Sequence, residues 1–104
     1  MTETVPEMLR ECAETYEARS PFYGDSYKTF GRVMRELFPG NAIKLNTVDD
    51  FNRYSVLVMI VGKLIRYCEN MDKGGHDDSL LDLAVYSQML RELDEEIRST
   101  SCPL

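Results

Sequence analysis

Hydrophobic and polar positions along this chain repeat at helical spacing in four segments. The pattern is clearest near the C-terminus, where apolar residues recur three and four positions apart, at Leu83, Tyr86, Leu90, Leu93 and Ile97. Side chains at that spacing lie on one face of a helix and form a seam for helix packing, either inside the chain or against another subunit. We predict one all-α domain over residues 1–104, a four-helix bundle with helices at about 6–19, 26–38, 48–71 and 77–98 and a loose tail over 99–104.

One segment, from Val56 to Val61, is apolar at every position. A run of six apolar residues suits either a buried strand or part of a buried helix. No turn signal occurs between Val48 and Asp72, and an uninterrupted interval of that length favours a helix. Because a helix that is apolar on all sides belongs at the centre of a bundle, we expect this segment to be covered all round.

Capping residues and a proline mark the predicted helix ends. Two sequences fit a capping box, in which a hydroxyl and a carboxylate each accept a backbone N–H of the other residue: Thr4 with Glu7, and Thr47 with Asp50. Asp77 or Asp78 is expected to cap the last helix. The first helix is expected to end at Arg19, since Ser20 precedes Pro21 and a residue before proline avoids the helical conformation.

Four charged residues are predicted to meet between the last two helices. The glycine turn at Gly74-Gly75 makes these helices antiparallel neighbours, so Lys63 and Arg66 fall at heights similar to those of Asp78 and Asp82. Each pair shares one helix face, because residues three or four apart lie on the same side. We expect all four charges in the core-facing part of the helix pair.

Three uses of this cluster remain open. The first is a structural ion-pair network that fixes the register of the two helices. The second is a polar pocket for a phosphate-bearing ligand, with Lys63 and Arg66 gripping the anion. The third is a metal site on Asp78 and Asp82.

Aromatic residues and the single histidine can support such a site. Tyr86 lies one turn beyond the acidic pair and can hydrogen-bond into it. Tyr23, in the predicted connector at 21–25 with Gly24, can stack on a base or anchor the core. His76 precedes the last helix without a nucleophile placed beside it by any motif, which favours a capping or hydrogen-bonding role.

Composition and charge narrow the function classes. The chain carries 12 Lys and Arg against 18 Asp and Glu, a net charge of −6, so we predict no direct binding to duplex nucleic acid. The longest apolar run is far short of a membrane span, and no signal peptide precedes it. Cys12, Cys68 and Cys102 are too far apart for a metal motif and suit reduced thiols. We therefore expect a cytoplasmic protein with no membrane contact.

Taken together, these motifs resemble an uncharacterised phage-encoded family in the all-α, MazG-like nucleotide pyrophosphohydrolase superfamily. The resemblance covers most of residues 14–93, and its specific part is K-x-x-R at 63–66 followed by H-x-D-S-x-x-D-x-x-x-Y at 76–86; Arg19, Tyr23-Gly24 and Phe30 add a weaker element. It implies a helical bundle commonly assembled as a dimer or tetramer, so we expect a homo-oligomer. For a phage-encoded protein the compartment is the host cytoplasm.

The chain departs from the catalytic members that it resembles. Those members hold Mg²⁺ on E-E-x-x-E in one helix and E-x-x-D in a later one. Here the later motif is half kept, at Ser79 and Asp82, and the earlier one is replaced by Lys63 and Arg66. Because two cations repel Mg²⁺, which needs anionic oxygen ligands, we expect no cofactor and no working metal site.

The leading hypothesis is a phage accessory protein that binds a nucleotide or a nucleotide-derived ligand without hydrolysing it, through Lys63, Arg66, Asp78, Asp82, Tyr86 and Tyr23. A second hypothesis is a small acidic inhibitor of a host defence protein, similar to an anti-CRISPR protein, which acts through the acidic faces of its first and last helices. A third is an active Mg²⁺-dependent nucleoside triphosphate pyrophosphohydrolase that uses Asp78, Asp82 and Glu69.

Overall fold

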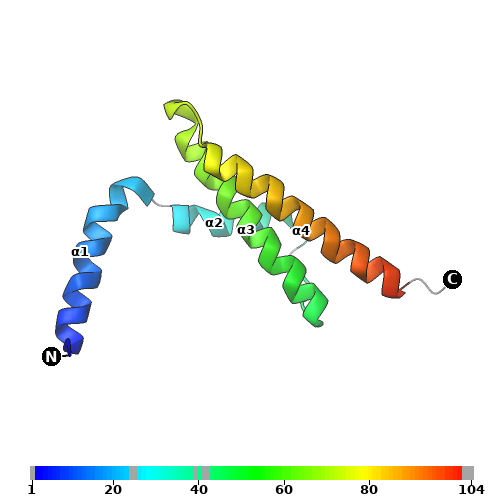
Figure 1. Ribbon diagram of the computed structural model, residues 1–104, viewed down its shortest axis with the longest axis horizontal. Coiled ribbons are helices and arrows are strands. Elements are labelled where there is room, and N and C mark those ends of the chain that lie inside the picture. The colour runs from blue at the N-terminus through cyan, green and yellow to red at the C-terminus, as the bar shows by residue number, and fades with distance from the viewer. Residues whose placement is uncertain (1, 24–25, 39, 41–42, 102–104) are drawn as a thin grey trace.

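The computed structural model describes residues 2–23, 26–38, 40 and 43–101, and every regular element among them is a helix (Figure 1). In chain order the elements are α1 (Val5–Tyr23), α2 (Ser26–Leu37), α3 (Val48–Asn70), the short 3₁₀ helix η1 (Met71–Lys73) and α4 (Asp77–Ser101). The predictions of an all-α fold and of four main helices are confirmed. Within the part of the chain that is described, no helix combines the length and the apolar character needed to cross a bilayer.

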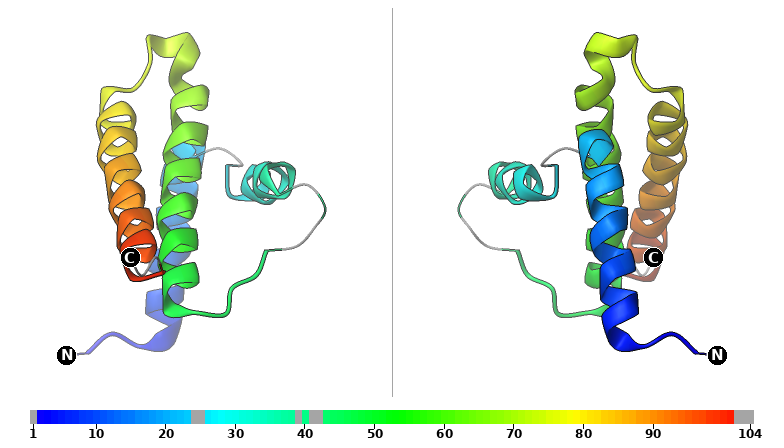
Figure 2. Two further views of the ribbon diagram at one scale, coloured as in Figure 1. Left: turned by 90° about the vertical axis from the view of Figure 1, so that its right-hand side faces the viewer. Right: turned by 90° about the vertical axis from the view of Figure 1, so that its left-hand side faces the viewer.

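The helices α3 and α4 lie side by side as an antiparallel hairpin (Figures 1 and 2). After η1, Gly74 and Gly75 turn the chain with φ values of 96° and 97°, in the left-handed region that favours glycine. Every position of the predicted seam is half-buried: Leu83, Tyr86, Leu90, Leu93 and Ile97. Because α4 packs on α3, the seam contributes to the interior of this chain.

The helix α2 crosses the same central helix, α3, away from the hairpin partner (Figure 2). Its apolar face turns inward, and Met34 is one of the few buried residues, at 8% exposure. A Cβ at Gly62 of α3 would lie 3.4 Å from Cε2 of Phe30, so the absence of a side chain there allows α2 to approach closely.

In contrast, α1 projects away from the other three helices (Figure 1), and every side chain from its start to Arg19 is exposed. The predicted end at Arg19 is wrong, because the helix continues through Pro21 to Tyr23. Pro21 lacks the N–H that would donate to the carbonyl of Glu17. The hydroxyl of Ser20 donates to that carbonyl instead, at 3.5 Å, which offsets part of the loss.

Both predicted capping boxes are present. In α1 the N–H of Thr4 donates to Oε2 of Glu7 at 3.0 Å, and the N–H of Glu7 donates to Oγ1 of Thr4 at 3.4 Å. In α3 the N–H of Thr47 donates to Oδ2 of Asp50, and the N–H of Asp50 donates to Oγ1 of Thr47, both at 3.1 Å. Each helix therefore begins where its own sequence places the start.

The predicted loose tail is wrong over residues 99–101, because α4 continues to Ser101. The hydroxyl of Thr100 donates to the carbonyl of Glu96 at 3.1 Å, and this bond holds the last turn. Residues 102–104, which include Cys102, and the predicted turn at Gly24 lie outside the described residues.

The interior of the described chain is small. Only Met34, Val61 and Ser79 among the described residues are buried, and Met59, within the segment expected to be covered all round, is 42% exposed. The radius of gyration is 18.5 Å, whereas a compact chain of this length has about 13 Å. The segment from Val56 to Val61 is therefore only partly covered, and the expectation of full cover is wrong.

Candidate anion-binding site

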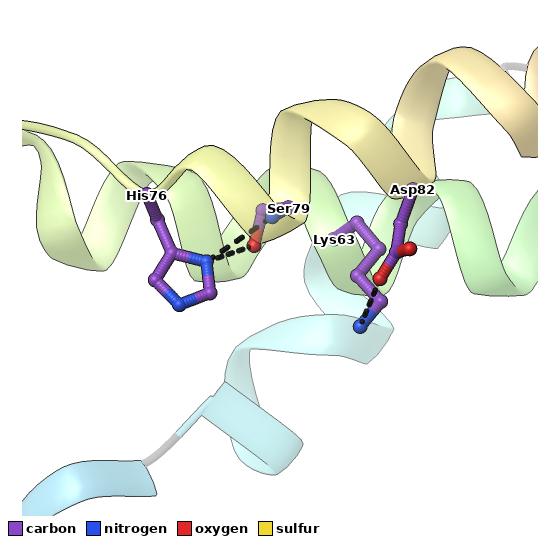
Figure 3. Close-up of polar contacts among 4 residues, drawn as sticks. All are labelled: Lys63, His76, Ser79 and Asp82. Carbon is purple, nitrogen blue, oxygen red and sulfur yellow. Dashed lines mark hydrogen bonds and ion pairs between the residues drawn. The ribbon is translucent and has the colours of Figure 1, made fainter.

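The best-defined part of the predicted cluster is one ion pair. Nζ of Lys63 in α3 lies 3.0 Å from Oδ2 of Asp82 in α4 (Figure 3). Their side chains are 31% and 41% exposed, and a pair this accessible stabilises a fold by only about 0–1 kcal/mol. The contact therefore matters more for where it holds the Lys63 ammonium than for stability.

All four predicted charges line one hollow of about 410 Å³ between α3 and α4, together with His76 and Leu81. The expectation that they face the core is wrong, since Arg66 and Asp78 are exposed. The reason lies in the helical register. Asp78 comes one position before the fully buried Ser79, and one position turns a side chain by about 100° toward the edge of the interface.

A second hollow, of about 370 Å³, adjoins the first because Lys63 and Arg66 line both. Its other walls are mostly apolar and aromatic: Tyr27, Phe30, Met59, Gly62, Ile65, Glu69 and Tyr86. Tyr86 lines this second hollow with the two cations, whereas the acidic pair lines the first, and the predicted hydrogen bond from Tyr86 into the acidic pair stays a prediction. Tyr27 was missed by the sequence reasoning, because its role depends on where α2 crosses α3.

His76 has a structural role at the start of α4. Its Nδ1 accepts the backbone N–H of Ser79 at 3.2 Å and lies 2.6 Å from the Ser79 hydroxyl (Figure 3), while its carbonyl accepts the N–H of Leu80. The predicted capping or hydrogen-bonding role of His76 is confirmed, and the cap expected from Asp77 or Asp78 is wrong. An Nδ1 that accepts the N–H carries no proton in the neutral ring, so the hydroxyl donates to it.

The short Ser79–His76 contact resembles a nucleophile beside a base, but its surroundings argue against that role. Ser79 is 0% exposed, so no substrate carbon or phosphorus atom can reach its hydroxyl. Instead, the hydroxyl and the backbone N–H of Ser79 both donate hydrogen bonds to Nδ1 of His76 at the start of α4.

Within the described residues, no group of three or more His, Cys, Asp and Glu side chains is arranged to hold a metal ion. Asp78 and Asp82 line one hollow, whereas Glu69, named in the hydrolase hypothesis, lines the other. One oxygen of Asp82 already contacts the Lys63 ammonium. The ammonium of Lys63 and the guanidinium of Arg66 beside these carboxylates are groups that attract anions.

Two other predicted residues need comment. Tyr23 is the last residue of α1, and its side chain lies outside the described residues. Asp94 of α4 lies away from this site, and its Oδ1 is 3.0 Å from Nε of Arg53 in α3. That pair borders a separate hollow of about 320 Å³ beneath residues 43–45.

Comparisons with protein-family models, curated proteins and solved structures find no match to this chain. The resemblance to a MazG-like phage family therefore stays a prediction.

Proposed function

We propose that this chain is a binding protein, a phage accessory protein on a MazG-like helical scaffold without a working metal site. Its ligand is a nucleotide or a nucleotide-derived molecule that occupies the two joined hollows. The ligand phosphate lies on Lys63 and Arg66. The observation that carries the proposal is the position of these two cations on the border between a polar hollow and an aromatic one.

The phosphate end depends mainly on Arg66. Among the residues that the structure describes, its guanidinium makes no ion pair, whereas Lys63 is held by Asp82. A guanidinium binds phosphate through two parallel hydrogen bonds. Because Arg66 is exposed where the two hollows meet, it can bind phosphate without breaking an internal contact. Asp82 orients the Lys63 ammonium beside it, and Asp78 is placed to accept hydroxyl groups of a sugar.

The base end is the adjoining hollow. Tyr27 and Phe30 from α2 and Tyr86 from α4 line it together with the apolar Met59 and Ile65. Flat aromatic faces favour stacking on a nucleobase, which contributes about 1–3 kcal/mol per base in single-strand complexes. Each hollow is within the range of about 300–1,000 Å³ that is typical of small-molecule sites.

Two features favour binding over hydrolysis. Phosphoryl chemistry in this superfamily needs a magnesium site, and the described acidic residues do not cluster into one. Ser79, whose hydroxyl lies against the histidine, is fully buried. The active pyrophosphohydrolase hypothesis is therefore the weaker one.

A thermal-shift titration with a panel of nucleoside mono-, di- and triphosphates, with and without Mg²⁺, tests the proposal. A ligand at 100 times its Kd stabilises the folded state by about 2.7 kcal/mol, and we expect this shift without Mg²⁺. Arg66→Ala should abolish it. Arg91→Ala, an exposed arginine on α4 that lines neither hollow, is the matched control and should keep it.

Other outcomes contradict the proposal. Mg²⁺-dependent release of pyrophosphate would favour the hydrolase hypothesis, and its loss on Asp82→Asn would locate the activity at this site. Indifference to every nucleotide would favour the acidic inhibitor, whose exposed acids on α1 and α4 then carry the function. In that case, binding to a purified nucleic-acid-guided nuclease should weaken when Glu92, Glu95 and Glu96 are neutralised.

A further inference from the structure

The two joined hollows impose an order on the parts of a ligand that fills them. Lys63 and Arg66 line both hollows, so a phosphate on these cations lies between the two spaces and not at the far end of either. On one side of the phosphate are the aromatic walls, and on the other are Asp78 and Asp82. A ligand that fills both hollows therefore has one group on each side of its phosphate.

The polar hollow is suited to a sugar and not to more phosphate. Figure 3 shows Asp82 and His76 extending from α4 toward the side on which Lys63 lies. An ionised carboxylate only accepts hydrogen bonds, so Asp78 and Asp82 attract a hydroxyl donor and repel a second phosphate. In a mononucleotide the order is base, sugar, phosphate, and only further phosphates could enter this hollow. A second sugar, esterified to the same phosphate, would place hydroxyl groups there.

The charges around the phosphate favour the same kind of ligand. Among the described residues that line the two hollows, three are acidic and two are basic: Glu69, Asp78 and Asp82, and Lys63 and Arg66. The contact between Lys63 and Asp82 leaves Arg66 as the lining cation without an ion pair. A phosphodiester carries one negative charge, whereas a terminal phosphate carries nearly two at pH 7, because its second pKa is about 6. Each extra charge is repelled by the carboxylates nearby.

We propose that the ligand is a dinucleotide, in which a phosphodiester joins two sugars, and not a nucleotide with a terminal phosphate. This inference rests on the proposed function and narrows it. One base stacks in the aromatic hollow, the bridging phosphate lies on Arg66 beside Lys63, and the second sugar donates a hydroxyl hydrogen bond to Asp78. Linear and cyclic dinucleotides share this bridging group.

Isothermal titration calorimetry without Mg²⁺ tests the inference on compounds that share one base, first adenine and then guanine. In the adenine set, ApA bridges two nucleosides in a linear chain and cyclic di-AMP bridges them in a ring. The tighter of these two should bind at least about tenfold more tightly than 5′-AMP or ATP, the usual effect of a hydrogen bond to a charged group. Equal or tighter binding of 5′-AMP or ATP overturns the inference.

The second sugar and the lower charge are separated by 3′,5′-cyclic AMP. This compound has the single charge of a diester but no second sugar, so it should bind more tightly than 5′-AMP and less tightly than the preferred dinucleotide. Binding as tight as that of the dinucleotide would show that the polar hollow receives no sugar, and it would overturn the inference.

Two substitutions of Asp78 test its contact with the second sugar. Asp78→Ala removes the acceptor and should weaken dinucleotide binding about tenfold, without weakening that of 5′-AMP. Asp78→Asn keeps an acceptor oxygen and removes the charge, so it should improve 5′-AMP binding more than dinucleotide binding. Asp77→Ala is the matched control, since this neighbouring exposed acid lines neither hollow, and it should change neither affinity. Equal weakening of both ligands by Asp78→Ala overturns the inference.

Failure of this inference differs from failure of the proposed function. If 5′-AMP binds as tightly as the dinucleotides and Arg66→Ala abolishes its binding, the proposed function stands and the dinucleotide is wrong. If no compound of either base set binds, both are wrong.

Discussion

The α3–α4 hairpin and α1 both have apolar residues at helical spacing, but they differ in how far those residues are covered. Both regions are long helices with a regular apolar stripe, and α1 and α3 begin with the same kind of capping box. The stripes of the hairpin cover each other, whereas that of α1 is exposed along its length. Local sequence is therefore enough to specify a helix, but its stripe does not specify which surface will cover it.

The largest predicted effect concerns the few buried positions of the hairpin. Val61 is 2% exposed, so Val61→Asp would bury an unpaired carboxylate and destabilise the chain by about 3–5 kcal/mol. Val85→Asp is the matched control, because Val85 is 52% exposed, and it should cost less than about 1 kcal/mol. Urea unfolding followed by circular dichroism measures both, and equal losses would contradict the assignment of Val61 to the interior.

The next largest effect is the loss of folding stability when the helix cap of either region is removed. His76→Ala leaves the buried N–H and hydroxyl of Ser79 without a partner, and we expect a loss of about 1–3 kcal/mol. His76→Asn keeps a capping acceptor and should recover much of it. Thr4→Ala removes the cap of α1 and should cost about 1 kcal/mol or less, since the side chains of α1 are exposed up to Arg19. Similar losses for His76→Ala and Thr4→Ala would contradict this difference between the regions.

The smallest effect is a pH dependence at the start of α3. The backbone N–H groups of Asn46 and then Thr47 donate to the Asp50 carboxylate and lower its pKa from 3.8. A lowered folded pKa means that this carboxylate stabilises the fold above pH 3.8 and that the contribution is lost as the pH falls through the lowered value. The melting temperature should therefore fall faster below pH 3.8 in the natural chain than in Asp50→Asn.

Asp49→Asn is the control for that measurement. It removes a neighbouring carboxylate from the first turn of α3 without breaking the capping box. It should leave the acid-induced decrease in melting temperature in place. An identical acid profile for the natural chain and Asp50→Asn would show that the two hydrogen bonds do not couple folding to pH.

Sequence patterns predicted local features well. The seam from Leu83 to Ile97 is half-buried as its spacing requires, and both capping boxes form because all their atoms lie within four residues. Some errors were local, such as the helix end at Arg19, and others arose where a distant partner decides the outcome. Asp94 is four residues after Leu90 and shares the face of the seam, but its ion pair with Arg53 depends on how α3 lies against α4.

The candidate site was predicted only in part, because some of its features are local and others depend on how separate helices are placed. Helical spacing and the glycine turn correctly placed Lys63 opposite Asp82, since both are a few turns from one bend. The spacing did not predict how exposed the charged side chains are. A shift of one residue along α4 is enough to turn a side chain from the buried seam to the solvent-exposed edge of the helix pair. It also did not give the aromatic hollow, whose Tyr27 is brought there by the crossing of α2.

By itself, the sequence determined four helices, their starts, the hairpin and the opposition of cations and carboxylates across it. Each of these depends on spacings within one helix or across one short turn. Only the tertiary structure decided which charges face solvent, where two hollows meet, and that the apolar stripe of α1 is exposed. Those features depend on how separate helices are oriented in space, and an apolar stripe alone does not distinguish a neighbour in the same chain from a neighbour in another.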